Sequence, residues 1–538
     1  MASVASEAEP EAEGARAVGR GGIAVLGAKI YFVLIGLVVQ TLLPRAIGLA
    51  GYGALARVLA IANVVNNVVV SSSTQGVSRT IASARDTTQG EAGDARGRGR
   101  EEAFRVTLRV HVPIAFALAA LFALVAPALA RFQSAPHITR PLQIIAGVVA
   151  AYGCYAPLVG YLNGRAMFTR QAALDALFAT LRTVGLLGAG AFFFTHWGSG
   201  VEGAVLGFVL AAVAIVPFAL RSTGIGRAPS SGVAPSPGAP RVGAYLALLG
   251  PLALAQLFTN AVMQSDITLL GRFLSLASHG AGLPAADAAK AADEWVAVYR
   301  ACQLFAFLPY QLLLSVTQIL FPMVAKAESE GDRPAVRLYV ERGARIGAIA
   351  CGLLVAIVAA LPGSVLGFAY GPVVAERGAA TLRVLAIGQG AFAMFAIVAT
   401  VLASLGRERI AAFLSLITLL VVGAACYVGA SDAPFGDPQL RATALATSVA
   451  LGLGLVAAAI VVKKYAGGFL PIGTILRVSL GLAAAVAMGM SLPPYSKLAT
   501  PLAAAGIATL YLVVLVISRE LTGADVAMVR LLFARKRG

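Results

Sequence analysis

The chain has 538 residues, of which 59% are hydrophobic and only 12% are charged. A soluble domain carries about twice that charged fraction, so the composition excludes a soluble globular protein and favours a polytopic membrane protein. The formal net charge of +17 is distributed between apolar runs rather than on one soluble face. It therefore indicates membrane topology signals and no nucleic-acid partner.

Apolar runs of about 20 residues, the length that crosses a hydrocarbon core, recur along the chain. Placing the N-terminus in the cytoplasm assigns most Lys and Arg residues to cytoplasmic segments, as the positive-inside rule requires, and an even number of spans keeps the C-terminus there too. We expect about 14 transmembrane helices, at residues 22–44, 51–75, 106–130, 141–163, 173–195, 200–220, 242–271, 294–322, 338–361, 379–404, 410–430, 440–462, 473–492 and 500–518.

The two ends of the chain differ in composition from these spans. Residues 1–20 are rich in Ala and Glu, with neither a basic n-region nor a small-residue cleavage site, which predicts a disordered cytoplasmic tail rather than a signal peptide. Residues 519–538 combine an apolar face with a basic ending, ARKRG. This pattern predicts an amphipathic basic helix on the anionic inner leaflet.

A short repeat suggests how the spans are grouped. TLLPR at the end of the first span returns as TLLGR at the end of the seventh, and both spans run from inside to outside in the predicted topology. We therefore expect two pseudo-symmetric six-helix bundles, at 21–221 and 242–462, joined by a cytoplasmic linker at 222–241 and followed by two additional transmembrane helices at 463–518. Parallel repeats of this kind place a substrate site between the bundles.

Polar side chains mark the first two spans. A charged side chain within the membrane is costly and is a candidate functional residue by default. Lys29 is inside the first span, where snorkelling to the surface is the alternative explanation. Arg45 ends that span, and Arg57 lies in the second. The asparagines of the second span share one helical face, which suits either interhelical hydrogen bonds or a hydrated cavity; they are Asn63, Asn66 and Asn67.

The seventh span carries a stripe of amides and one acid. Gln256, Asn260 and Gln264 follow one another at helical spacing on one face. Asp266 is the one carboxylate that lies clearly inside a predicted span. Two interpretations of it stay open: a site for proton or sodium coupling, and a structural ion pair.

The eighth span repeats the pattern of polar residues. Arg300, Gln303 and Gln311 fall on one side of it, and Pro309 interrupts the helix. The planar guanidinium of arginine binds phosphate through two parallel hydrogen bonds. The stripe therefore favours an anionic ligand.

The sequence lacks the motifs of several enzyme classes. It contains no GxxxxGK[ST] phosphate loop for ATP, no HExxH and no GxSxG. Its four cysteines all fall in apolar runs without the spacing of a zinc site. We therefore expect neither an enzyme nor a metal site, and no cofactor; a proton or sodium gradient is the expected energy source.

Three segments resemble a known family. LLPRAIGLAGYGALARVLAIANVV is similar to the first two helices of polysaccharide flippases in the multidrug/oligosaccharidyl-lipid/polysaccharide (MOP) exporter superfamily. MQSDITLLGRFL and VAVYRACQLFAFLPYQLLLSVTQILFPMVAKA are similar to the seventh and eighth helices of these proteins. The matching residues are Arg45, Gly48, Tyr52, Gly53, Asp266, Gly271, Tyr299, Phe321 and Pro322. The 281–293 insertion and residues 1–20 depart from the family pattern.

The resemblance implies a secondary transporter of the bacterial inner membrane. Its substrate would be a polyprenyl-pyrophosphate-linked oligosaccharide such as an O-antigen or other lipopolysaccharide precursor, moved from the cytoplasmic to the periplasmic leaflet by alternating access. A polysaccharide polymerase and chain-length machinery would be partners, together with membrane lipids. Asp266 would couple ions. The residues expected to bind substrate are Arg45, Arg57, Arg300, Lys29, Gln264, Asn260, Gln303 and Gln311.

Other functions compete with this one. A lipid II-type peptidoglycan precursor flippase of the same superfamily fits the same features. A multidrug or cation antiporter would be expected to have several intramembrane acids, whereas this chain has one clear candidate. A membrane glycosyltransferase or polysaccharide polymerase would need a sizeable catalytic loop, and the loops here are short.

Overall fold

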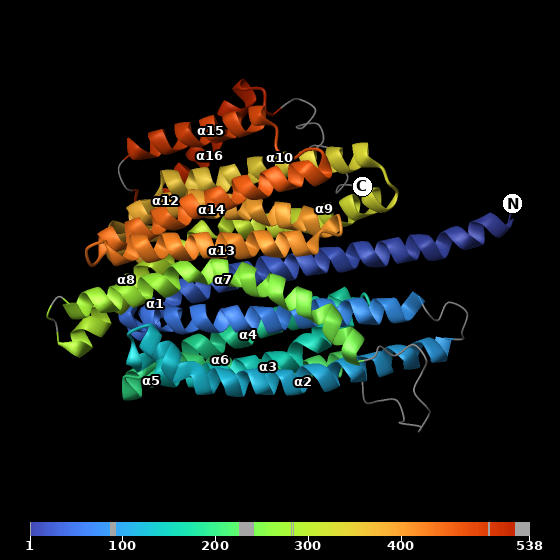
Figure 1. Cartoon of the computed structure of the whole chain (residues 1–538), viewed down its shortest axis with the longest axis horizontal. Helices are drawn as coiled ribbons and strands as arrows, with labels where there is room; N and C mark the ends of the chain where they lie inside the picture. Colours follow the sequence, from blue (N-terminus) through green and yellow to red (C-terminus); the bar gives the residue numbers. More distant parts are fainter. Residues whose placement is uncertain are drawn as a thin grey trace. The chain divides into compact units, whose positions relative to one another are not determined.

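The computed structural model describes residues 2–86, 93–224, 242–280, 282, 284–492 and 495–521. These residues form helices and no strands, which confirms the all-helical polytopic fold class. The first part comprises α1 (Ala2–Asp86), α2 (Gly93–Phe132), η1 (Pro136–Ile138), α3 (Thr139–Gly164), α4 (Phe168–Val184), η2 (Gly185–Ala189), α5 (Gly190–Trp197), α6 (Gly200–Thr223) and α7 (Val242–Gly280) (Figure 1).

The remaining helices follow in the second half of the chain, and all except α11 are labelled in Figure 1. They are α8 (Ala285–Ala306), α9 (Leu308–Ser329), α10 (Arg333–Ala360), α11 (Pro362–Tyr370), α12 (Pro372–Ser404), α13 (Glu408–Ser431), α14 (Asp437–Ala466), α15 (Ile472–Met490) and α16 (Thr500–Ile517).

The helices form two compact units. The first contains the residues up to Gln264 together with Ala289–Glu294, and the second contains Ser265–Ala288 and the residues from Trp295 on. The division thus falls inside α7 and α8 rather than at the linker predicted at 222–241. Residues 225–241 of that linker, and the basic tail from residue 522, lie outside the described residues.

The long helix α1 contains the first two predicted spans. It is continuous except at Gly48, where φ is 76° and the helix kinks; this positive φ is readily adopted only by glycine. The segment 1–20, predicted to be a disordered tail, is helical from Ala2 onward, in keeping with the strong helix propensity of its Ala and Glu residues.

Among the described residues, twelve helices are long and apolar enough to cross a membrane. This set differs from the fourteen predicted spans at two places. The first candidate, Leu34–Ala82, is 49 residues long and includes the second half of the first predicted span and all of the second, one on each side of the kink. The eighth predicted span corresponds to α8 and α9, which are separated at Phe307 just before Pro309 and are not among the twelve.

Close helix packing holds the first unit together around α3, most of which is buried. A Cβ atom added at Gly153 of α3 would lie 1.8 Å from the Cβ of Ala115 on α2. Gly185 and Gly207 bring η2 and α6 together in the same way, because a Cβ at Gly207 would lie 2.0 Å from the Gly185 carbonyl oxygen. Small residues permit this backbone approach, which is typical of membrane helix bundles.

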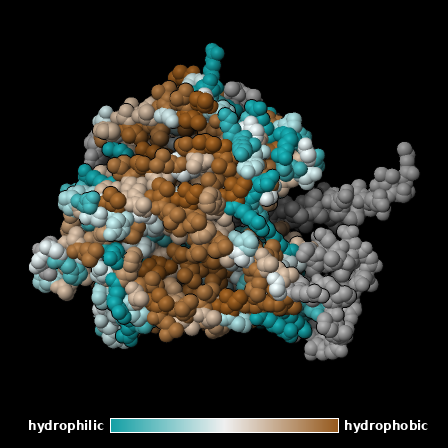
Figure 2. Space-filling model, viewed as in Figure 1, coloured by the Kyte–Doolittle hydropathy of each residue, from teal (hydrophilic) through white to brown (hydrophobic). Residues whose placement is uncertain are grey.

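In the second unit, α15 and α16 pack on α10. Tyr511 of α16 is fully buried there, with Ala356, Ala485 and Leu515 around it. Away from these contacts, large hydrophobic side chains such as Leu476 and Ile517 are exposed, and brown hydrophobic surface covers much of the face in Figure 2. Exposed apolar side chains of this extent suit a surface in contact with lipid.

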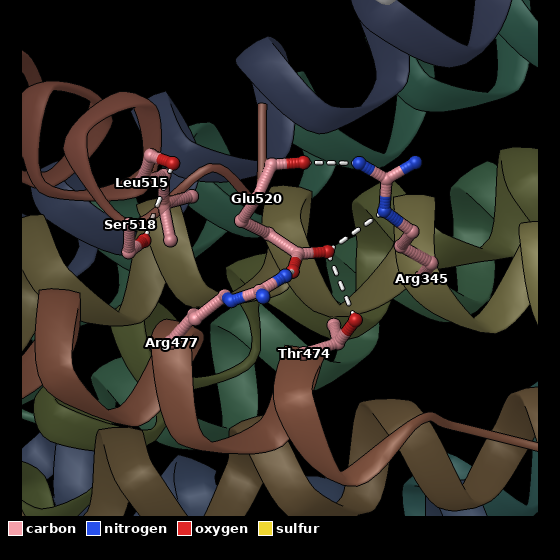
Figure 3. A network of polar contacts seen from close by, with 6 residues as sticks. All are labelled: Arg345, Thr474, Arg477, Leu515, Ser518 and Glu520. Carbon is pink, nitrogen blue, oxygen red and sulfur yellow. Dashed lines mark hydrogen bonds and ion pairs between the residues drawn. The ribbon is translucent and has the colours of Figure 1, made fainter. Parts of the chain in front are cut away.

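A carboxylate network joins the chain that follows α16 to α10 and α15 (Figure 3). One carboxylate oxygen of Glu520 lies 2.7 Å from Nε of Arg345 and accepts a hydrogen bond from Thr474 at 2.9 Å, and its other oxygen accepts one from Arg477 at 3.0 Å. The Arg345 guanidinium also donates to the Glu520 backbone carbonyl. The Glu520 side chain is only 1% exposed.

Candidate functional site

A buried charged cluster lies in the first unit. Nε of Arg57, on α1, is 2.8 Å from Oδ1 of Asp293, on α8, and these side chains are 0% and 5% exposed. The other oxygen of Asp293 lies 2.8 Å from Nε2 of His137 in η1. One carboxylate therefore contacts two basic side chains from distant parts of the sequence, and neutralises the arginine that we predicted to bind substrate.

The asparagine and glutamine stripes of α1 and α7 meet in the same unit. Nδ2 of Asn67 donates to Oδ1 of Asn260 at 2.7 Å, and Asn260 donates to the backbone carbonyl of Gln256 at 2.8 Å. This contact supports the interhelical interpretation for Asn67. By contrast, the buried amide of Asn66 and the Oε1 of Gln264 have no hydrogen-bond partner among the described residues. These atoms are free to bind water or a polar ligand group.

A second cluster surrounds Asp266 in the second unit. Oδ2 of Asp266 accepts a hydrogen bond from Tyr299 at 2.8 Å, and Oδ1 accepts one from Nε2 of Gln303 at 2.9 Å and one from the Ile267 backbone at 2.7 Å. The amide oxygen of Gln303 in turn accepts from Arg300 at 3.2 Å. Asp266, Tyr299 and Gln303 are buried and Arg300 is half-buried. Gln303 thus links a buried acid to the predicted substrate arginine.

The other predicted residues are not brought into these clusters by any contact described. Arg45 is exposed on α1, three residues before the kink. Gln311 is exposed on α9. Lys29 is on α1, and its side chain lies outside the described part of the structure. Substrate binding by these residues stays a prediction.

Two features of the first unit were not predicted from the sequence. Asp293 lies one residue before the predicted eighth span, and no role was predicted for His137, so the contacts of Asp293 with Arg57 and His137 were missed. The need of an intramembrane arginine for a counter-ion is the signal that could have pointed to Asp293. His111 of α2 is buried between Tyr245 Oη at 2.6 Å and Ser73 Oγ at 3.0 Å.

The described residues contain no group of three His, Cys, Asp or Glu side chains that could hold a metal ion. Each unit thus contains a buried carboxylate that is close to an arginine. Asp293 contacts Arg57 directly, whereas Asp266 is linked to Arg300 through Gln303. This arrangement suits the binding and release of small ions or of an anionic group.

A polytopic helical bundle with buried charged clusters has the architecture of a membrane transporter. Solved structures with this fold include "Lipid II flippase MurJ, inward closed conformation", with a TM-score of 0.68 and 13% identity over 93% of this chain and 99% of that one. An inward-facing multidrug resistance MATE family transporter of the MOP superfamily matches with a TM-score of 0.61 and 14% identity, over 82% and 98%. At these identities the likeness concerns the fold.

A mutant of the Vibrio cholerae MATE transporter VcmN is also similar, with a TM-score of 0.56 and 16% identity over 84% of this chain and 96% of that one. A search of curated proteins finds no significant match. The model of the family described as "Polysaccharide biosynthesis protein" matches residues 18–328, more than half of the chain. The chain therefore belongs to the polysaccharide biosynthesis protein family, in agreement with the resemblance found in its sequence, and its fold is shared with transporters of the MOP superfamily.

Proposed function

We propose that the protein is a flippase that moves a polyprenyl-pyrophosphate-linked oligosaccharide from the cytoplasmic to the periplasmic leaflet of the bacterial inner membrane. The observation that carries this proposal is the family match over residues 18–328, because this stretch includes both buried clusters. The protein would act as a transporter in surface polysaccharide synthesis, upstream of a polymerase, and not as an enzyme.

In this proposal Arg300 binds the pyrophosphate, and substrate binding by Arg45 stays a prediction from the sequence. Arg300 is the better-supported residue because it is half-buried and donates a hydrogen bond to Gln303, which holds its guanidinium next to the Asp266 cluster. Arg45 is exposed on α1. A guanidinium that is held in place loses little side-chain entropy when it binds a bidentate anion.

Asp266 is the proposed site of proton or sodium coupling. Its carboxylate is buried and is held by neutral donors, Tyr299 and Gln303, with Arg300 one step away. Binding of a proton or a sodium ion to Asp266 would alter the hydrogen bond that Gln303 donates to its carboxylate. Because Arg300 donates to Gln303, the position of Arg300 would change as well. Binding of the coupling ion and of the substrate would thereby be linked within one network.

The test is translocation of a fluorescent polyprenyl-pyrophosphate oligosaccharide in proteoliposomes, with and without a proton or sodium gradient. We expect Arg300→Ala to lose at least about tenfold in rate, as one charge-assisted phosphate contact would predict, and Asp266→Asn to lose the response to the gradient. Arg441→Ala, at an exposed arginine of α14, is the control and should transport normally.

Two other activities are tested in the same vesicles. A lipid II-type substrate is the second candidate, favoured by the fold match to the lipid II flippase over 93% of the chain. Faster movement of lipid II than of the oligosaccharide would assign the protein to that activity. Gradient-driven efflux of organic cations without movement of either lipid would overturn the flippase proposal in favour of a cation antiporter.

A further inference from the structure

A pocket of about 800 Å³ opens at one end of the second unit. It is lined by the last residues of α9, the first turns of α10, the connection between α12 and α13, and the end of α14 with the glycine that follows it. The topology predicted from the sequence places all of these segments on the cytoplasmic side. None of the residues predicted to bind substrate or to couple ions lines this pocket.

The acidic residues of the pocket are already paired. Glu328 forms an ion pair with Arg333, in which Oε2 lies 3.1 Å from Nη1. Glu341 forms one with Arg337, in which Oε1 lies 2.8 Å from Nε. Each of these pairs is close to neutral as a unit. The positive charge that remains in the pocket must therefore come from its other basic residues.

Arg407 and Lys464 supply that charge. Both line the pocket, and neither lies within 4.0 Å of a carboxylate among the described residues. The guanidinium of Arg407 lies over the ring of Tyr465, 5.1 Å from its centroid, which orients the side chain while its N–H edges remain able to donate. The carbonyl of Tyr465 accepts from Arg333 at 3.4 Å, so the same residue also contacts a paired arginine.

One wall of the pocket is formed where the glycines that follow α14 pack closely on the Glu341 side chain. Gly467, at the end of α14, has a φ of 76°, and a Cβ added at Gly468 would lie only 2.2 Å from Oε1 of Glu341. The connection from α14 to α15 therefore rests directly on the Arg337–Glu341 pair. A methyl group at residue 468 would displace Glu341, and with it Arg337, without changing any charge.

We propose that this pocket binds a phosphate group, either on the head group of an anionic phospholipid or on a soluble phosphate ester. An oriented arginine and a lysine that line one pocket, neither with a carboxylate within 4.0 Å among the described residues, are suited to a phosphate. The volume is within the range of ligand sites, about 300–1,000 Å³. Leu338 and Leu405 provide an apolar edge. The site is separate from the proposed transport path and does not depend on it.

The experiment measures the binding of two probes to the full-length protein in neutral detergent. Inorganic pyrophosphate is titrated by calorimetry, and thermal unfolding is followed in micelles containing either dioleoylphosphatidylglycerol or dioleoylphosphatidylcholine. The variants are Arg407→Gln/Lys464→Gln, which removes the unopposed charge, and Gly468→Ala, which keeps it. The matched control is Lys326→Gln/Lys463→Gln, which removes the same charge from two exposed residues nearby that do not line the pocket.

We expect at least one probe to bind wild-type and control protein alike, and to bind Arg407→Gln/Lys464→Gln about tenfold or more weakly, with Gly468→Ala in between. Added salt should weaken the binding. Pocket-dependent pyrophosphate binding identifies a soluble phosphate ester, and pocket-dependent stabilisation by phosphatidylglycerol alone identifies a lipid. If neither probe distinguishes the pocket variant from the control, the proposal is wrong.

Discussion

Nε of Arg57 and Oδ1 of Asp293 lie 2.8 Å apart inside the first unit, with their side chains 0% and 5% exposed. The contact joins the second predicted span to the start of α8, and His137 approaches the other oxygen of the same carboxylate. A buried ion pair contributes little net stability compared with apolar residues, but removing one partner leaves a charge without compensation. The stable packing of α1 and α8 therefore requires both residues of the pair.

The first prediction concerns this pair. Asp293→Asn should lower the free energy of unfolding by about 3–5 kcal/mol, because it leaves the buried Arg57 charge uncompensated. Thermal or denaturant unfolding in detergent, followed by circular dichroism, measures the change. The double variant Arg57→Met/Asp293→Leu should recover much of the loss. Asp287→Asn, at an exposed acid in the first turn of α8, should change stability by less than about 0.5 kcal/mol.

The second prediction separates two glutamines that the sequence placed on one face. Gln303 donates to Asp266 and accepts from Arg300, so Gln303→Leu removes a donor from a buried carboxylate and should cost about 1–3 kcal/mol. Gln311 is exposed, and Gln311→Leu should leave stability unchanged. Both are measured by unfolding in the same detergent. If the two substitutions changed the free energy of unfolding equally, the prediction that only the buried glutamine stabilises the fold would be wrong.

Hydrophobic length was sufficient to predict the helical architecture. Runs of about 20 apolar residues located the spans that correspond to α2–α4, α6, α7, α10 and α12–α16. The kink at Gly48 was not predicted, since a single glycine in an apolar run does not reveal a positive φ. Nor was the division within α7 and α8, because it depends on which helices pack together rather than on local composition.

The polar stripes identified candidate helix faces, but they could not show which residues contact one another. Asp266 was singled out as the carboxylate inside a predicted span; its side chain is buried, and its contacts to Tyr299 and Gln303 come from α8. The partner of Arg57 could not be identified, because ion pairing over so long a sequence separation depends on tertiary structure. Asp293 also fell outside the predicted span by one residue, within the error of any boundary drawn from hydropathy.

A third prediction tests the close approach of η2 and α6. Gly207→Ala places a Cβ about 2.0 Å from the Gly185 carbonyl oxygen, a backbone atom that cannot move aside alone. The two helices must separate, and we expect a loss of about 1–3 kcal/mol. Gly188→Ala, in the same η2 segment as Gly185, is the control, because nothing lies within 4 Å of its added Cβ. That control should be neutral or slightly stabilising. A neutral Gly207→Ala would contradict the packing described.

The last prediction concerns pH and the Glu520 network. Burial of the Glu520 carboxyl favours its neutral form, but hydrogen bonds from Arg345, Arg477 and Thr474, with the charge of Arg345, outweigh burial and hold its pKa below the ordinary value. A lowered pKa means that the ionised network stabilises the fold above the ordinary carboxyl pKa, and that this stabilisation is lost as pH falls through the lowered value.

Glu520→Gln should therefore destabilise the protein by about 1–3 kcal/mol at neutral pH, and the difference from wild type should shrink as the pH is lowered below about 4. Unfolding of both proteins across a pH series measures this. Glu330→Gln, at a carboxylate 57% exposed in a surface pair with Lys326, should show little effect at any pH. A difference between wild type and Glu520→Gln that grows on acidification would reverse the sign expected from the network, and would mean that Glu520 is held in its neutral form.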